Sequence, residues 1–255
     1  MAVLSKLLKY DFRANIKIFL FIWPAIVIFA VLERLAISAD IEGSAGTLLV
    51  STTTTVFVLA VIAAVVFSLV ISIIRYYGGL LRSEGYLMFT LPVKPWQLIF
   101  SKFLTAFVTV LVTAVLSVLS VIFLFSGIDG MLEGIRQIWS MMDMPTGTTL
   151  ILVILVCVVS TAMLLLQIYV ACAIGHLFKR LRILFSVLAY YAINILIEIV
   201  TIAALIVVGA NGYFDNISTS GGNCLLGGIL CGLVVLCVVY YFVTERILRK
   251  KLNLE

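Results

Sequence analysis

A single carboxyl group stands deep inside an apolar stretch of this sequence. Glu198 is the only acidic residue in such a place, and an ionisable side chain surrounded by lipid is costly enough to indicate a function. Tyr190, Asn194, Glu198 and Thr201 recur at helical spacing, so they form one polar stripe on a helix. The stripe predicts a contact to a substrate or a proton. The alternative is a protonated, hydrogen-bonded packing residue near the outer membrane interface.

Hydroxyl residues form a second polar pattern. They occupy every fourth position of one helix, at Ser101, Thr105, Thr109, Thr113 and Ser117. Small hydroxyl residues on one ridge let helices approach closely, and each hydroxyl can donate to the carbonyl one turn earlier. Close packing is therefore one interpretation of this ridge. The other is that Thr109 and Thr113 line a transport path.

The remaining reactive residues do not assemble a catalytic or metal site. His176 is the only histidine, so it has no second histidine with which to hold a metal. The five cysteines lie in apolar stretches without a Cys-x-x-Cys pair, which favours packing. The sequence also contains no Gly-Lys dipeptide and hence no phosphate-binding P-loop. We expect no enzyme activity, no metal and no cofactor bound by this chain.

The composition places these residues in a membrane. Of the 255 residues, 64% are hydrophobic and 11% are charged, a balance that a domain with a wet surface does not reach. A helix needs about 20 apolar residues to cross a bilayer. At the outer end of the short first span, Glu33 and Arg34 are expected to extend toward water. We predict an all-α polytopic membrane protein, one transmembrane domain with spans at about 16–37, 50–75, 96–126, 148–177, 183–209 and 223–245.

The basic residues predict the orientation of these spans. Fifteen of the 17 lysines and arginines precede the first span, follow the sixth, or lie between spans two and three or four and five. Because cytoplasmic loops are enriched in Lys and Arg, we expect both termini in the cytoplasm and the protein in the plasma membrane. The net charge of +5 then reflects topology and contact with anionic lipid, and nucleic acid is not an expected partner.

The orientation also gives the depth of each polar residue. Counting about 1.5 Å per residue from the cytoplasmic end of each helix, Asn194 lies near the depth of Gln167. By the same count, Glu198 lies near the depth of Ser160 and Thr161. These residues would be neighbours if spans four and five pack together. Gln167 therefore joins Asn194 and Glu198 as a candidate for the substrate path.

Three further segments flank the spans. Residues 1–15 place apolar side chains on one helical face and basic ones toward the other, which is typical of a helix in the inner headgroup layer. Residues 75–102 form the longest inner connection, in which Pro95 suits the first turn of the third span. On the outside, residues 127–147 carry apolar residues at helical spacing after Asp129 and predict a short amphipathic helix on the outer surface.

The inner connection carries a recognisable motif. Residues 83–93 read Ser-Glu-Gly-Tyr-Leu-Met-Phe-Thr-Leu-Pro-Val, and residues 99–102 open the third span and end in a lysine. This resembles the Glu-Gly, Leu-Pro and Lys pattern of bacterial type-2 ABC transporter permeases, the six-helix exporters. The layout is similar to that family too, with an amphipathic amino-terminal helix, six spans and both ends inside.

The resemblance implies an assembly. Two permease chains, identical or sister, would pair, and each would receive a separate ATPase subunit that binds ATP and Mg²⁺ on the cytoplasmic face. The elbow at residues 77–89 would act as a coupling helix. In it Arg82, Glu84 and Gly85 are expected to carry the coupling, with Glu84 as the charged contact and Gly85 as the turn. Closure of the ATPase dimer would switch the cavity between the permeases from inward to outward access.

Two other classes compete with this interpretation. A stand-alone secondary transporter or channel would need no ATPase, but a proton-coupled carrier usually has more charged residues or broken helices inside its spans. An intramembrane enzyme would need a catalytic partner for His176 or Glu198 at matching depth, and the sequence offers none. We therefore expect the transmembrane permease subunit of an ATP-driven ABC exporter.

Overall fold

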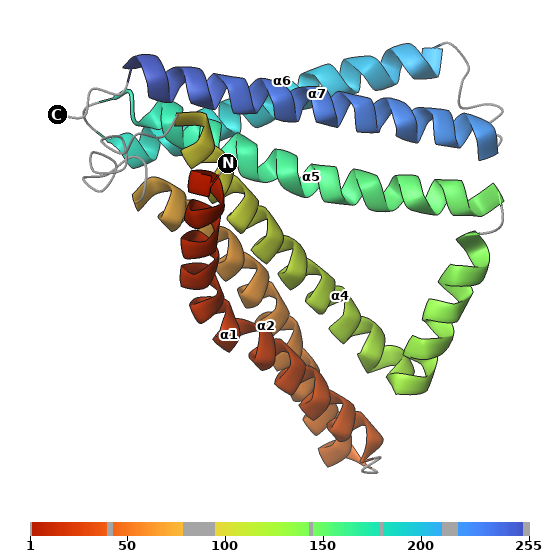
Figure 1. Cartoon of the computed structure of the whole chain (residues 1–255). Coiled ribbons are helices and arrows are strands. Elements are labelled where there is room, and N and C mark those ends of the chain that lie inside the picture. Colours follow the sequence, from red (N-terminus) through yellow and green to blue (C-terminus); the bar gives the residue numbers. More distant parts are fainter. Residues whose placement is uncertain are drawn as a thin grey trace. The chain divides into compact units, whose positions relative to one another are not determined.

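Helices make up the regular structure of this chain in the computed structural model, which describes residues 2–39, 43–78, 95–142, 145–178, 181–210 and 219–251 (Figure 1). The all-α prediction is confirmed for these ranges. A helix satisfies every backbone N–H and C=O within its own segment, which is the requirement that lipid imposes. The helices are α1 (Ala2–Ser38), α2 (Ser44–Tyr76), α4 (Pro95–Met142), α5 (Pro145–Gly175), α6 (Arg182–Ala210) and α7 (Thr219–Lys251).

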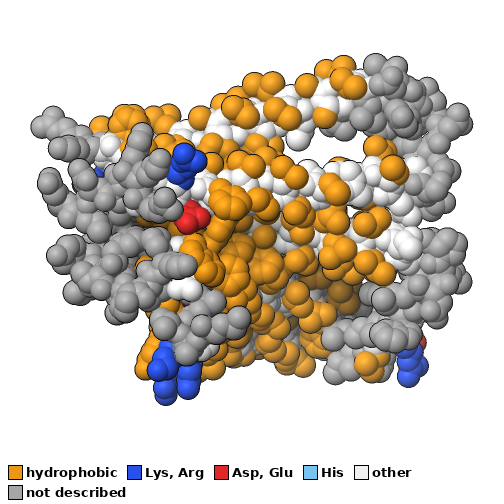
Figure 2. All heavy atoms as spheres, turned by 45° about the horizontal axis from the view of Figure 1, so that its top comes forward, with side chains coloured by type: hydrophobic (Ala, Val, Ile, Leu, Met, Phe, Trp, Pro, Cys, Tyr) orange, Lys and Arg blue, Asp and Glu red, His pale blue; other side chains and the backbone are white. Residues whose placement is uncertain are grey.

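Each of the described helices contains a stretch that is long and apolar enough to cross a membrane. Apolar side chains stay exposed along these helices, and few charges interrupt them in Figure 2. Such a surface is stable against lipid and unfavourable in water. The prediction of six spans is thus confirmed by length and composition within the described ranges. The spans are Ser5–Ser38, Ser44–Tyr76, Trp96–Phe125, Gly147–Gly175, Arg182–Ala204 and Gly221–Leu248.

Helix α1 joins the predicted interfacial segment to the first span without a break. It has 37 residues, which corresponds to about 55 Å at 1.5 Å per residue. The hydrocarbon core of a bilayer is about 30 Å thick, so nearly half of α1 extends beyond it. That length leaves room for residues 1–15 outside the core. Their place in the inner headgroup layer stays a prediction.

Helix α4 starts at Pro95, as predicted, and is interrupted at Gly127. Gly127 has φ 67° and ψ −169°, which is not a helical conformation. The apolar part of α4 ends just before this break, and the helix resumes after it and continues to Met142. The sequence prediction of a short helix within residues 127–147 is therefore confirmed. Its position on the outer surface stays a prediction.

The chain divides into two compact units, which are described separately. The first comprises Met1–Ser72 and Leu104–Ser140. Its core brings together one side chain from each of three helices, because Ala30 of α1, Phe57 of α2 and Leu124 of α4 are buried against one another.

The second unit comprises Ile73–Phe103 and Met141–Glu255, and therefore contains the end of α2, the start of α4 and the whole of α5, α6 and α7. Helix α5 is its centre and packs against both α6 and α7. Leu166 and Val170 of α5 and Tyr240 of α7 form its buried cluster, with Ile193 and Ile197 of α6 packed against it.

In the first unit, Arg34 supplies a hydrogen-bond donor to α4 at the break. Its Nη1 donates to the carbonyl oxygen of Leu124 over 2.8 Å. Leu124 lies within four residues of Gly127, so its carbonyl is among those that a helix end leaves without a backbone partner. A cation at the C-terminal end of a helix is also favoured by the helix dipole. The prediction that Arg34 extends into water is wrong, because this side chain is half-buried and bonded to α4.

The variant Gly127→Ala tests this junction. We expect it to lower the stability of the chain by about 1–2 kcal/mol, because a side chain at positive φ is strained. In addition, the added carbon would lie 3.0 Å from Nη2 of Arg34. The measurement is the thermal unfolding midpoint in detergent. Gly134→Ala is the matched control, because nothing lies within 4 Å of its added carbon. Equal unfolding midpoints for the two variants would contradict the strained backbone at Gly127 and its contact with Arg34.

Candidate functional site

The predicted coupling residues cannot be placed. Arg82, Glu84 and Gly85 all fall between Gly78 and Pro95, outside the residues that the structure describes. Their role therefore stays a prediction from the sequence. The described residues on either side of this connection, at the end of α2 and the start of α4, belong to the second unit.

The hydroxyl ridge of α4 is a packing surface for α1 in the first unit. Thr109 and Thr113 are buried and donate to the carbonyls of Thr105 and Thr109, one turn earlier. Thr109 Oγ1 also accepts from Asn15 Nδ2 over 3.4 Å. Thr113 Oγ1 accepts from Trp23 Nε1 over 3.1 Å. Because both oxygens already have partners on α1, this geometry favours packing over the lining of a transport path.

The structure does not bring the polar stripe of α6 together with Gln167. Ile193 and Ile197 pack on the buried cluster that α5 and α7 form, and the stripe residues Asn194 and Glu198 follow them by one position each. Glu198 is exposed, and Asn194 Nδ2 donates to the carbonyl of Tyr190 on its own helix. Gln167 of α5 is 4% exposed. Helices α5 and α6 do pack together, but no described hydrogen bond joins Gln167 to the stripe.

A buried carboxyl group that sequence reasoning missed lies in the first unit. Glu33 is 1% exposed, and Thr54 Oγ1 of α2 donates to its Oε1 over 2.5 Å. The prediction that Glu33 extends toward water is therefore wrong. The signal was present in the spacing: Asn15, Ile26, Ala30 and Glu33 fall on one buried face once α1 is extended to Ser38.

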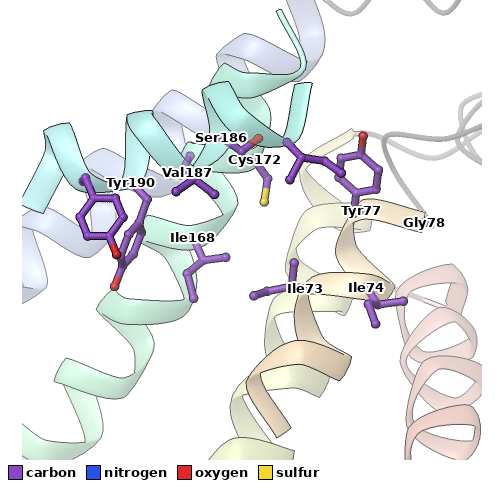
Figure 3. Close-up of a pocket in the computed structure, with 12 residues that line it drawn as sticks. Ile73, Ile74, Tyr77, Gly78, Ile168, Cys172, Ser186, Val187 and Tyr190 are labelled. Atoms are coloured by element: carbon purple, nitrogen blue, oxygen red, sulfur yellow. The ribbon is translucent and has the colours of Figure 1, made fainter. Parts of the chain in front are cut away.

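The second unit contains a pocket of about 650 Å³ formed by three helices. This volume lies in the range of about 300–1,000 Å³ that is usual for ligand sites. Figure 3 shows Ile73 of α2 and Tyr77, which follows α2, on one side, and Val187 and Tyr190 of α6 on the other. Ile168 and Cys172 of α5 lie between them. The lining is predominantly apolar, with hydroxyl groups from tyrosines and Ser186 and no Asp or Glu among the described residues.

Stacked aromatic rings hold the end of α2 against α5 beside this pocket. Tyr76 and Tyr169 are fully or almost fully buried. Their ring centroids are 3.8 Å apart and their planes differ by 7°. An aromatic pair contributes about 0.5–1.5 kcal/mol beyond the burial of its area. The position of α2, and with it one wall of the pocket, therefore depends on this pair.

Tyr77 and His176 continue this contact at the mouth of the pocket. Their ring centroids are 5.4 Å apart, and His176 follows directly after the last residue of α5. Burial, and secondly the positive charge of Arg182, lower the pKa of His176 from its ordinary value of 6.5. His176 is therefore mainly neutral at pH 7, and Arg182 is the charged group among the described residues at this mouth.

The variant Gly175→Ala tests the wall between α5 and α6. An added carbon at Gly175 would lie 2.6 Å from the backbone nitrogen of Ser186 and 2.7 Å from the carbonyl oxygen of Arg182, so α6 would have to shift. We expect a loss of about 1–3 kcal/mol in stability, as for overpacked cores. The measurement is thermal unfolding in detergent. Gly227→Ala is the control, because nothing lies within 4 Å of its added carbon. Equal unfolding midpoints for the two variants would refute the close approach of α6 to Gly175.

The lowered pKa of His176 predicts a pH dependence of stability. As the pH falls below 6.5, the unfolded chain binds a proton at this residue before the folded chain does, so the folded state loses stability. His176→Gln removes this proton site. We expect the midpoint of the wild type to fall more between pH 7.5 and pH 5.5, roughly one unit either side of the ordinary histidine pKa, than that of His176→Gln. An equal fall of the unfolding midpoint in the two proteins would contradict the burial of the His176 ring.

Comparisons with models of protein families, with curated proteins and with solved structures find no match to this chain. Six apolar helices within the described ranges indicate a multi-pass membrane protein, and the chain divides into two compact units. The second unit carries an apolar pocket between α2, α5 and α6.

Proposed function

We propose that this chain is the membrane-spanning permease subunit of an ATP-driven ABC exporter. The observation that carries the proposal is the pattern at residues 83–93 and 99–102, which resembles the coupling elbow of type-2 ABC permeases. In this chain residues 83–93 lie between the second and third of the six apolar helices that the structure describes, and residues 99–102 lie near the start of the third. The absence of a P-loop from the sequence agrees with ATP hydrolysis on a separate subunit.

The ends of the elbow support this proposal, because both are attached to the second unit. At the end of α2, Tyr76 stacks on Tyr169 of α5. At the start of α4, the carbonyl oxygen of Trp96 accepts from the hydroxyl of Tyr241 of α7 over 2.9 Å. A force applied to residues 79–94 by an ATPase would therefore be passed to α5 and α7. Helix shifts driven in this way are a usual means of switching access.

The proposed assembly follows the family pattern. Two permease chains enclose the translocation path, and each binds a separate ATPase subunit that carries ATP and Mg²⁺. Glu84 is the charged contact to the ATPase, Gly85 allows the turn, and Arg82 supports the same surface. Both termini and the elbow lie on the cytoplasmic side, where fifteen of the 17 basic residues gather.

A stand-alone carrier is the second candidate, and Glu33 is the observation that favours it. A buried carboxyl inside an apolar helix is a common feature of proton-coupled transport. Glu33 is 1% exposed, and its Oε2 has no hydrogen-bond partner within the described part of the chain. Its bond to Thr54 of α2, however, fits equally a packing role between two helices. The resemblance at the elbow therefore decides for the ABC permease.

The variant Glu84→Lys tests the proposed function. The tagged chain is isolated from its native membrane in mild detergent, and the subunits that remain bound are identified by mass spectrometry. We expect the wild type to recover a soluble subunit with a P-loop. Glu84→Lys should reduce this recovery at least about tenfold, because it leaves a charge of the partner unpaired. Glu133→Lys, an exposed acidic residue on the predicted outer side, is the matched control.

Two results would contradict the proposal. One is reproducible recovery of the chain alone in a detergent that preserves a known ABC complex. This outcome would favour the stand-alone carrier. The other is equal recovery of the ATPase with Glu84→Lys and Glu133→Lys, which would reject the coupling role of Glu84 while leaving the assembly intact.

A further inference from the structure

The pocket of the second unit is joined to a second cavity that has a different character. This cavity has a volume of about 700 Å³ and shares Tyr77, Ile183 and Val187 with the pocket. It adds Arg182, the first residue of α6. Because they share these three residues, the two cavities adjoin. We call them together the path, which leads from apolar residues to a guanidinium group.

The interior of this path suits a hydrocarbon chain. Ile73, Ile168 and Val187 line it, from three different helices. An apolar cavity binds water poorly, because a water molecule needs two to four polar partners. Around a helix that crosses a membrane, the apolar molecule at hand is a lipid. A sugar polymer or a nucleotide would leave most of its polar groups without a partner in such a lining.

The residues at the mouth of the path determine which sign of charge is favoured on a ligand. The titratable groups that line the two cavities, among the described residues, are Tyr77, Cys172, Tyr190, Tyr191 and Arg182. His176 lies against Tyr77. Tyrosine and cysteine are neutral at pH 7, and burial keeps His176 neutral as well. Neither cavity is lined by Asp or Glu within the described part of the chain. Arg182 is therefore a cation that favours an anionic partner.

The position of Arg182 at the end of an apolar span corresponds to the level of lipid headgroups. The apolar part of α6 begins at Arg182, and that of α5 ends at Gly175, so Arg182 stands at the boundary of both spans. Its side chain is exposed. Arginine binds phosphate through two parallel N–H groups, which gives it a strong preference for this anion. Basic pockets between transmembrane helices on the cytoplasmic side are known to take anionic headgroups.

We propose that the pocket between α2, α5 and α6 is a binding site for an anionic phospholipid of the adjacent leaflet. One acyl chain lies among Ile73, Ile168 and Val187, and the phosphate pairs with Arg182. The bound lipid connects the end of α2 to the start of α6, and thereby stabilises the part of α2 from which the inner elbow departs. The proposal needs only that these helices cross a membrane, and it does not depend on the ABC assignment.

Native mass spectrometry of the purified full chain tests this site. The protein is equilibrated with equal amounts of phosphatidylglycerol and phosphatidylcholine that have the same acyl chains. We expect the wild type to retain phosphatidylglycerol about tenfold better, because the choline cation of phosphatidylcholine offsets the phosphate charge that pairs with Arg182. Arg182→Gln should bring the two lipids to nearly equal retention. Arg246→Gln, another exposed arginine at the end of α7, should keep the preference and is the matched control.

The apolar part of the site is tested separately. Val187→Trp fills the pocket and should reduce retention of both lipids. Val238→Trp is its control, because Val238 on α7 has the same exposed fraction of 49% and does not line the pocket. Equal retention of the two lipids by the wild type would overturn the proposal. So would equal behaviour of Arg182→Gln and Arg246→Gln, or of the two tryptophan variants.

A measurement on the wild type alone covers the case in which a variant fails to fold. Dodecyl phosphate combines an apolar chain with a phosphate and should displace bound phosphatidylglycerol. Dodecanol has the chain without the charge, and inorganic phosphate has the charge without the chain, so neither should displace it at the same concentration. Equal displacement by dodecanol would show that Arg182 does not select an anion, and displacement by inorganic phosphate would show that the chain is not bound. Either result would overturn the proposal.

Discussion

Hydrogen bonding of polar groups in apolar surroundings is the constraint on which this structure depends. Four side chains of α1 each make a bond to another helix: Asn15 and Trp23 to hydroxyls of α4, Glu33 to a hydroxyl of α2, and Arg34 to a carbonyl of α4. Such bonds contribute about 0.6–2 kcal/mol each between membrane helices. Because lipid offers no alternative partner, they specify which faces of α1, α2 and α4 meet.

In the second unit, aromatic rings and tight backbone approach join the helices in addition to hydrogen bonds such as that from Tyr241 to Trp96. Tyr76 stacks on Tyr169, Tyr77 lies against His176, and Gly175 lets α6 approach the end of α5. These contacts gather the ends of α2, α5 and α6 around one apolar pocket. The end of α2 also leads into the elbow. A ligand in the pocket and a partner on the elbow would therefore act on the same few residues of α2.

Much of the fold could be predicted, because each span is specified locally. Apolar length predicts a membrane helix wherever it occurs, and Pro95 marked the start of α4 correctly. The candidate site was harder to predict. Thr109 and Thr113 were identified as either packing or path residues, and only their bonds to Asn15 and Trp23 favoured packing. Glu198 drew attention because it is isolated in the sequence, yet its side chain is exposed while Glu33 is buried.

The sequence by itself determined the helical class and the apolar spans, because these depend on composition and spacing along one helix. The side of the membrane on which basic residues gather stays a prediction. Tertiary structure alone decided which residues are buried together. Two pairs illustrate this: Glu33 and Thr54 are 21 positions apart, and Tyr76 and Tyr169 are 93 positions apart. Helical periodicity predicts which face of a helix is buried but not which helix packs against it. The pocket likewise exists only where α2, α5 and α6 converge, because each contributes one wall and none encloses a cavity alone.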